Sequence, residues 1–475
     1  MANYRTPGVY VEEISKFPPS VAQVETAIPA FIGYTQRAAD PLGDLNLRPK
    51  RITSLLEYEA YYGTAEPKDD ITVTINETTD GSGNLVERTV NGSVAGPAVH
   101  NMYYAMQAFF ANGGGPCYIV STGLMSAAAG NVSAGDLEDG LNTLTAVDEV
   151  TLIVFPELQA LAIGDVGAVL TAALNQCGRL QDRFVVADIL PPGVGETILD
   201  AANTFRGANL PLDNLKYGAV YTPNVYTTLN YVYDEAQVTI SRVVNGTTPE
   251  VSTMDSFRPN AADPSVGNSV LFNLSKAAID RITLELPVAP LAVGQYASVD
   301  STRGVWKAPA NVSLATVVEP VIKITHEQQQ DLNVSTTGKS INAVRTFAGK
   351  GTLIWGARTL AGNDNEWRYI SVRRFFNMAE ESVKKATEQF VFEPNDANTW
   401  VKVRAMIENF LLLQWRAGAL AGTVPEDAFY VRVGLGSTMT ALDILEGRMN
   451  VEIGMAVVRP AEFIILKFSH KMQES

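Results

Sequence analysis

Two short apolar runs, Thr151-Leu-Ile-Val-Phe155 and Phe184-Val-Val-Ala-Asp188, flank a stretch at residues 166–177 whose pattern indicates a helix. Apolar runs of about four to eight residues, rich in β-branched and aromatic side chains, are typical of buried strands. Strands that alternate with helices in this way predict an α/β layer with some parallel pairing.

The residues before this layer predict more strands and helices and one insertion. The expected elements are strands at residues 28–34 and 117–120 and helices at residues 52–62 and 100–110. Residues 69–91 are polar and carry the turn pairs Asp80-Gly81 and Asn91-Gly92. Such pairs favour tight hairpin turns, so we expect an exposed hairpin insertion here.

The residues after the layer predict a second insertion and a domain boundary. Residues 224–263 are rich in Thr, Val, Tyr and Asn and are expected to be β-rich, and residues 269–285 are expected to be helical. Residues 287–311 contain many Pro and Gly residues, which predicts a connection. We therefore expect one α/β domain at residues 21–320 and a second domain at residues 321–475.

The last third of the chain has the clearest helical pattern. Residues 373–390 are expected to be a helix, supported by Glu380→Lys384 and Glu381→Lys385 pairs. Pro394-Asn395-Asp396 is expected to end this helix and start another. The second helix should end at Gly418 and bury one face, which consists of Trp400, Val403, Ile407, Phe410 and Leu411. Strands are expected at residues 429–433 and 451–457.

Both ends of the chain predict strands without a local partner. Val9-Tyr10-Val11 lies between the turn signal Pro7-Gly8 and the stiff pair Pro18-Pro19. Near the other end, Pro460 precedes an apolar run made of Phe463, Ile464, Ile465, Leu466 and, after a lysine, Phe468. A short strand is not stable alone, so both segments need a sheet edge to join.

Composition and charge argue against several classes of protein. The formal net charge of −15 argues against binding to nucleic acids or to anionic membranes. No apolar run reaches the length of about 18 residues that a membrane span needs, and no apolar signal segment opens the chain. We therefore expect synthesis and folding in the cytoplasm, or exit by a route that needs no signal peptide. The 2 cysteines, Cys117 and Cys177, are expected to be buried thiols.

No motif indicates catalysis, a cofactor or a metal site. The 3 histidines, His100, His326 and His470, form no metal-ligand motif. Gly113-Gly114-Gly115 is expected to be a turn, and Gly338-Lys339-Ser340 lacks the first glycine of a nucleotide-binding loop. A paired-carboxylate site stays open, although no carboxylate stands out. We expect a protein that is not an enzyme.

Several motifs together resemble the contractile tail sheath family. The chain opens with Thr6-Pro-Gly-Val-Tyr-Val-Glu-Glu-Ile14, and Ile28-Pro-Ala-Phe-Ile-Gly-Tyr-Thr35 follows. The later motifs, in family order, are Arg303-Gly304-Val-Trp306-Lys307-Ala-Pro309-Ala-Asn311, Trp355-Gly-Ala-Arg358-Thr-Leu360, Trp367-Arg-Tyr-Ile-Ser-Val-Arg373-Arg374, Val391-Phe392-Glu-Pro394-Asn395 and Pro460-Ala-Glu462-Phe463. Each motif alone is weak, but their order over both ends of the chain is specific.

The resemblance implies a multidomain fold that combines α+β and α/β parts. A sheath assembly domain would be built from both termini, as helices packed on a small β-sheet that the arms of neighbouring copies complete. An α/β outer domain would carry the β-rich insertions near residues 69–91 and 224–263. Residues 1–20 would be an exchange arm, and the run that starts at Phe463 would be the exchange strand at the other end.

The resemblance also implies a function and partners. Family members polymerise as stacked rings around an inner tube and contract to drive the tube through a target envelope. The expected partners are further copies, the inner tube protein, baseplate and terminator or cap proteins, and sheath paralogues, with no nucleic acid and no direct membrane insertion. Assembly would occur in the bacterial cytoplasm, for a phage tail or a tail-like particle that is released or membrane-anchored. The alternative is another self-assembling shell or surface-layer protein.

Two sets of residues keep alternative interpretations. The 5 tryptophans are interpreted as core anchors, with partner contacts as the alternative: Trp306, Trp355, Trp367, Trp400 and Trp415. Arg373 and Arg374 are interpreted as facing the tube or a neighbouring copy, with a solvated helix start as an equal alternative.

Overall fold

The computed structural model describes residues 20–128, 130–259 and 267–466, which fold into two compact units. Of these residues, unit 1 takes 20–24 and 378–458, and unit 2 takes 25–377 and 459–466. The division falls inside helix α10 (Ile370–Thr387), later than the boundary expected near residue 320. It lies later because residues 342–354 supply two strands to the large sheet of unit 2.

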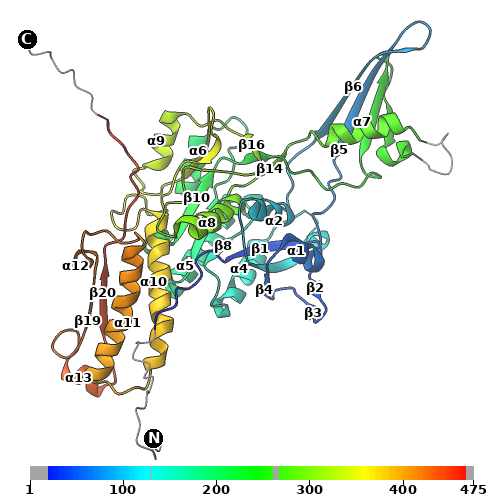
Figure 1. Cartoon of the computed structure of the whole chain (residues 1–475). Helices are drawn as coiled ribbons and strands as arrows, with labels where there is room; N and C mark the ends of the chain where they lie inside the picture. The colour runs from blue at the N-terminus through cyan, green and yellow to red at the C-terminus, as the bar shows by residue number, and fades with distance from the viewer. Residues whose placement is uncertain (1–19, 129, 260–266, 467–475) are drawn as a thin grey trace, which may run out of the picture. The chain divides into compact units, whose positions relative to one another are not determined.

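A 9-stranded sheet forms the centre of unit 2 (Figure 1). Its strands, in spatial order, are β15 (Val312–Ser313), β18 (Gly351–Ile354), β17 (Asn342–Phe347), β10 (Gly218–Thr222), β9 (Phe184–Asp188), β8 (Leu152–Val154), β1 (Pro29–Thr35), β7 (Cys117–Leu124) and β4 (Lys50–Ile52). Neighbouring strands from β17 to β7 run parallel, and Leu152 lies opposite both Pro29 and Phe184. The predicted α/β layer with parallel pairing is confirmed.

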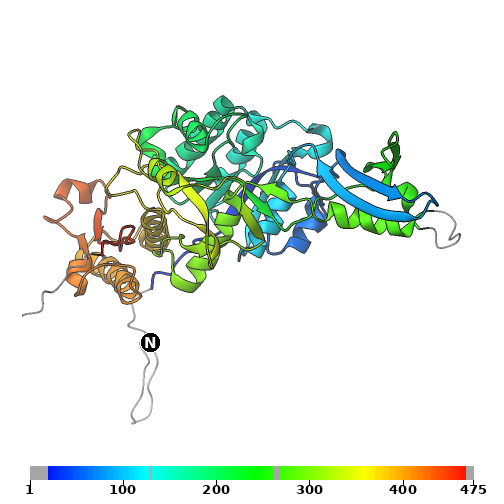
Figure 2. The ribbon, with the colours of Figure 1, turned by 90° about the horizontal axis from the view of Figure 1, so that it is seen from above.

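Helices cover both faces of this sheet, because successive side chains of a strand point to opposite faces and both sets are apolar. Phe31 belongs to the cluster that contains Phe109 of α2 (Met102–Ala111) and Leu291 of α8 (Ala289–Arg303). Its neighbour Ile32 belongs to a second cluster, with Val169 of α5. The helices on that side are α4 (Ala134–Thr143), α5 (Ile163–Leu180) and α6 (Ile198–Arg206). Figure 2 shows helices on opposite sides of the sheet.

Helix α8 contradicts the expectation of a connection at residues 287–311. The helix begins with Ala289-Pro290, and proline is tolerated in a first turn because its missing N–H would have no acceptor within the helix. The N–H groups of Val288 and Ala289 donate to the buried carboxylate of Asp188, each at 2.9 Å. The expectation was wrong because it treated Pro290 as a helix breaker without regard to its position.

The two predicted insertions join in one 4-stranded sheet of unit 2, ordered β13-β12-β5-β6. Strands β5 (Ile71–Thr79) and β6 (Leu85–Val94) form the expected hairpin, while β12 (Thr239–Val244) and β13 (Glu250–Thr253) come from the β-rich run. The hairpin is not exposed on both faces, since Ile71, Val73 and Ile75 are fully buried. Asn91-Gly92 lies within β6 instead of in a turn. A Cβ on Gly92 would lie 2.8 Å from the carbonyl oxygen of Ala278 in α7 (Ser269–Ile279), so the glycine permits close helix packing.

The other elements of unit 2 are short. They are β2 (Ala39–Asp40), β3 (Gly43–Asp44), α1 (Leu55–Tyr62), α3 (Met125–Ala128), β11 (Val225–Thr227), β14 (Leu284–Leu286), β16 (Val317–Pro320) and α9 (His326–Asn333). The expected helix at residues 269–285 is therefore too long, because α7 ends at Ile279 and β14 follows. Cys117 and Cys177 are buried free thiols, as predicted. Within the described ranges, no helix combines the length and apolar character that crossing a bilayer requires.

Unit 1 contains the second half of α10, the long helix α11 and a 2-stranded sheet. Its elements after α10 are α11 (Ala397–Arg416), α12 (Pro425–Ala428), β19 (Phe429–Val433), α13 (Ala441–Leu445) and β20 (Val451–Met455). Asp396 caps α11 by accepting a hydrogen bond from the Thr399 N–H at 3.0 Å, as its position predicts. The predicted face of α11 is buried except for Trp400, which is half-buried.

We expect Asp188 to make the stability of unit 2 depend on pH. Burial raises the pKa of Asp188 to about 7, against the lowering effect of the two N–H donors. The folded state therefore binds a proton more tightly than the unfolded state, and this stabilisation is lost as pH rises through about 7. Chemical denaturation from pH 5 to 9 should show the free energy of unfolding falling by about 3 kcal/mol more in wild type than in Asp188→Asn, with the fall between pH 5 and 7. The exposed Asp69→Asn is the control, and equal pH slopes in wild type and Asp188→Asn would contradict the prediction.

Candidate functional site

The first group of motif residues surrounds the start of α10 within unit 2. The side chain of Arg374 is 3% exposed, and its guanidinium pairs with Asp300 of α8, with Nη1 at 3.1 Å from Oδ1. Its Nη2 also donates to the carbonyl oxygen of Thr26 at 3.0 Å, and the Thr26 hydroxyl donates to Asp300 at 2.6 Å. The cluster thus ties α10 to α8 and to the segment that enters β1.

Arg373 lies in the same turn and is equally buried, at 2% exposure. Its Nε donates to Asn377 Oδ1 at 2.7 Å, and its guanidinium lies 4.3 Å from the ring centre of Trp367. Both interpretations of Arg373 and Arg374 were therefore wrong: neither side chain reaches a surface of unit 2, where a tube or solvent would meet it. The physical reason is that α10 already begins at Ile370, which places both arginines inside unit 2.

The motif at residues 303–311 forms the turn from α8 to β15. Gly304 has a φ of 88°, and a Cβ there would lie 2.4 Å from the Trp306 ring, so only glycine fits. The Trp306 ring meets Phe375 of α10 edge-on at 6.5 Å, and Asn311 in a left-handed conformation donates its N–H to the Ile354 carbonyl at 2.8 Å. Arg303 is exposed, Lys307 is half-buried and Pro309 is buried. The residues of this motif thus serve packing. Burial lowers the pKa of Lys307, and the nearby positive charge of Arg303 lowers it further.

All 5 tryptophans are half-buried, so they are neither fully buried core anchors nor fully exposed partner contacts. Each still contacts its own unit. Trp355 packs against Phe347 at 4.5 Å and Trp367 against Phe376 at 5.0 Å, whereas the indoles of Trp400 and Trp415 donate to Asn395 and to the Gly422 carbonyl. They therefore anchor local packing without forming the deep core.

The second group of motif residues holds the segment that follows unit 1. We call it the clamp, and it consists of Arg358, Glu462, Asn333 and Tyr369. Arg358 Nη2 donates to Glu462 Oε2 at 2.6 Å and Nε donates to Oε1 at 3.0 Å, a bidentate pair. Asn333 Nδ2 donates to Glu462 Oε1 at 2.7 Å, and the Tyr369 hydroxyl donates to Oε2 at 3.2 Å. The remaining donor of Arg358, Nη1, faces the carbonyl oxygens of Gly362 and Asn333.

The electrostatics of the clamp favour a charged Glu462. Burial alone would raise the pKa of Glu462, but the hydrogen bonds from Arg358 and Asn333 outweigh it and lower the pKa. Burial and the nearby Glu462 carboxylate raise the pKa of Tyr369, so this hydroxyl remains a donor. The clamp contributes its stability above the ordinary glutamate pKa and loses it as pH falls through the lowered value.

Directly after the clamp, the chain exposes an apolar run. Phe463, Ile464, Ile465 and Leu466 are 70%, 79%, 79% and 71% exposed, and none of them pairs in a strand within the described residues. Phe468 and the expected strand Val9-Tyr10-Val11 lie outside the described residues. Phe392, in the connection between α10 and α11, is also fully exposed, with a left-handed φ of 69°, and Pro394 beside it is exposed.

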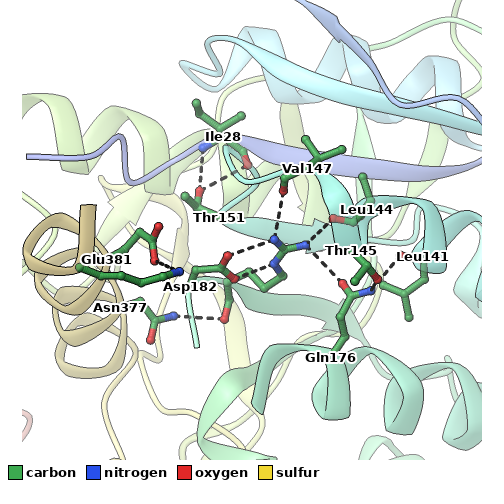
Figure 3. Close-up of polar contacts among 12 residues, drawn as sticks. Ile28, Leu141, Leu144, Thr145, Val147, Thr151, Gln176, Asp182, Asn377 and Glu381 are labelled. Carbon is green, nitrogen blue, oxygen red and sulfur yellow. Dashed lines mark hydrogen bonds and ion pairs between the residues drawn. The ribbon is translucent and has the colours of Figure 1, made fainter. Parts of the chain in front are cut away.

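Sequence reasoning missed several buried polar groups. Arg183, 1% exposed, donates to the carbonyls of Leu144 and Val147, to Gln176 and to Asp182 (Figure 3). Only the adjacency of Asp182 and Arg183 could have indicated this cluster. His100 lies 3.6 Å from the buried Glu157, a pair that no sequence motif marks. The residues of the clamp were named as motif members, but nothing in the sequence predicted that Arg358 and Glu462 would meet.

Comparison with solved structures decides the family. The chain is 31% identical to the sheath chain of the anti-feeding prophage helical sheath in its contracted state, covering 98% of this chain and 100% of that one with a TM-score of 0.63. The chain belongs to the contractile tail sheath family. It is also 29% identical, over 99% of both chains and with a TM-score of 0.63, to a chain of the contracted sheath complex of the extracellular contractile injection system PVC.

Three further similarities concern only part of this sheath protein. The family described as phage tail sheath C-terminal domain matches residues 362–471. The tail sheath protein of Enterobacteria phage T4 is 27% identical over 126 residues, which make up 26% of this chain and 19% of the T4 protein. The tail sheath protein of Vibrio phage KVP40 is 25% identical over 126 residues, with the same coverage. The match to the phage proteins thus spans about a fifth of their length.

We expect Arg374→Ala to destabilise unit 2 by about 3–5 kcal/mol, because it leaves the Asp300 carboxylate buried without a countercharge. Arg404→Ala is the control, since Arg404 forms an exposed ion pair with Glu408 at 2.7 Å and its loss should cost at most about 0.5 kcal/mol. Urea denaturation of both variants measures the difference. Equal losses in the two variants would show that the Arg374 pair does not hold α10 to α8.

Proposed function

We propose that this chain is the structural subunit of a contractile sheath, which polymerises around an inner tube and contracts to drive the tube through a target envelope. The observation that carries the proposal is the similarity to the contracted sheaths over nearly the whole chain. An exposed apolar run that leaves a buried clamp suits a subunit that links to its neighbours through its own chain. A structural role, without catalysis, fits the arrangement of the motif residues, which serve packing.

We propose strand exchange between copies as the way in which the two terminal segments find a sheet edge. Within the described residues, β19 and β20 pair only with each other, so each offers one open edge. An extended segment can add to such an edge through main-chain hydrogen bonds, each worth about 0.5–1.5 kcal/mol net. We assign residues 463–468 and residues 1–20, with Val9, Tyr10 and Val11, as the donor arms, and the β19–β20 sheet of another copy as the acceptor. Linking copies head to tail in this way produces open polymers.

The two units support a division of labour. Unit 1, with its helices and small sheet, is assigned as the assembly domain, and this assignment moves its expected start from residue 321 to 378. Unit 2, with the joined insertions at residues 69–91 and 224–263, is assigned as the outer domain together with the clamp. The helices α10 and α11 of unit 1 are the elements that the assembly domain was expected to pack on its sheet.

The partners follow from the same assignment. Two related solved structures are titled as baseplates of the anti-feeding prophage, and the chain is 31% and 25% identical to sequences in them. We therefore include the baseplate as a partner, together with further copies, the inner tube protein, terminator or cap proteins and sheath paralogues. Assembly in the bacterial cytoplasm, as part of a phage tail or tail-like particle, completes the proposal.

The proposal predicts that the purified chain forms hollow striated tubes in negative-stain electron microscopy, with and without its inner tube partner. Ile464→Glu/Leu466→Glu should abolish most tubes, because charged side chains cannot be buried on a neighbouring sheet. The subunit should keep its unfolding midpoint, since both side chains are exposed. Removal of residues 1–20 should have the same effect.

The control is Leu42→Glu, which adds a charge at another exposed apolar position, 87% exposed. This variant should form tubes at the wild-type yield. Tubes from the arm variants at the wild-type yield would contradict strand exchange, and dispersed particles from wild type under both conditions would contradict the sheath function.

A further inference from the structure

The course of the chain after β20 shows an unexpected attachment. Val458 still belongs to unit 1, where its N–H donates to the Ala419 carbonyl at 3.1 Å. Arg459 already belongs to unit 2, where its Nη1 donates to the Asn365 carbonyl at 2.7 Å, and Glu462 then enters the clamp. The exposed run starts at the next residue. The segment that follows the assembly unit in sequence is therefore attached to the other unit.

The contacts of the clamp favour the docked position of the C-terminal segment. The Arg358 side chain is 4% exposed, and its countercharge is the carboxylate of Glu462. A buried guanidinium that loses its carboxylate is strongly destabilised, so unit 2 itself favours the docked segment. Five hydrogen bonds converge on the two oxygens of one carboxylate, which fixes the position of the carboxylate as well as its charge.

We propose that the clamp is the mechanical root of the C-terminal segment: it ties residues 463 onward to unit 2 and sets the free length of the arm. This inference rests on the proposed function. A neighbouring copy that captures the arm on its β19–β20 sheet then pulls on unit 2 of the donor. Movement of one subunit is passed to the next through Glu462 and Arg358. Arg358 and Glu462 act as positioning residues and need not touch the neighbouring copy.

Opening the clamp would lengthen the link between copies. Residues 459–462 would join the free arm, and four extended residues add about 13 Å of reach. Copies would remain connected, because the exchanged strand is unchanged. However, each subunit could move by that distance before the link became taut and moved the neighbouring copy. Contraction would therefore no longer spread along the sheath as one event.

The root can be tested on the isolated subunit by chymotrypsin cleavage after Phe463. A protease must draw several residues on each side of the cut into its cleft, and the clamp at Glu462 opposes this. Glu462→Gln should speed cleavage after Phe463 by about tenfold or more, because the charge-assisted pair is lost. Cleavage after the exposed Phe392 of unit 1 is the internal reference for protease activity at a site outside the clamp, and its rate should not change. Glu319→Gln, which removes an exposed pair with Lys323, is the control variant.

The double variant Arg358→Gln/Glu462→Gln carries the test if the single variant does not fold, because it leaves no unpaired buried charge. It should also be cleaved rapidly after Phe463. Cleavage after Phe463 at the wild-type rate in these variants would overturn the root, whatever the sheath does.

The consequence for the lattice is tested on assembled sheaths. Mild urea is the trigger, and electron microscopy counts extended, contracted and partly contracted particles. Wild type and Glu319→Gln should give only the first two classes, whereas the clamp variants should assemble and give many partly contracted particles. All-or-none contraction of the clamp variants would overturn the coupling while leaving the sheath function intact. Absence of tubes from wild type would overturn the proposed function, and the cleavage experiment would still decide the root.

Discussion

A charged group that leaves water is stable only when it is paired and its other hydrogen bonds are also satisfied, because desolvation otherwise exceeds the attraction. Much of this structure depends on that constraint. Arg374 and Asp300 join α10 to α8, Arg358 and Glu462 join the C-terminal segment to unit 2, and each partner comes from a distant part of the sequence. These pairs act at defined points and so specify which segments meet, whereas the apolar clusters could tolerate many arrangements.

The parallel sheet also contains a buried carboxyl group, but backbone N–H groups satisfy it in place of a countercharge. At the carboxyl end of β9, Asp188 accepts hydrogen bonds from the N–H groups of Val288 and Ala289 at the start of α8, and it forms no ion pair within the part of the chain that the structure describes. The N-terminus of a helix carries partial positive charge and unsatisfied donors, so it attracts an anion. Here the chain places its own carboxyl group at that position, although burial raises the pKa of Asp188 to about 7. The N-terminus of α8 is thereby held to the sheet. The position of α8 in turn fixes the motif at residues 303–311, which follows it, and the start of α10, which pairs with it through Arg374 and Asp300.

The sequence predicted the fold best where the signal is local. The apolar runs at β1 and β9, the hairpin of β5 and β6, and the cap of α11 by Asp396 were all expected, because periodicity, turn pairs and capping residues act over a few positions. Helix α8 was missed because the effect of Pro290 depends on its place in the helix. The burial of Arg373 and Arg374 was missed for a different reason: their surroundings, Trp367, Tyr296 and Asp300, are set by tertiary packing. Pairing of Arg358 with Glu462 needed the same long-range information.

Rooting the C-terminal segment on unit 2 also explains why Pro460-Ala-Glu462-Phe463 has its composition. Pro460 favours an extended approach and removes one N–H that an unpaired stretch would leave without an acceptor. Glu462 then places one carboxylate opposite a preformed fork of donors, and Phe463 begins the exposed run. Over two residues the chain changes from a buried charge to an exposed apolar side chain, and in the proposed strand exchange the link to other copies begins at this point. A polymer whose subunits must move without separating needs that point to be fixed, because slack at the root would absorb the motion that the link has to transmit.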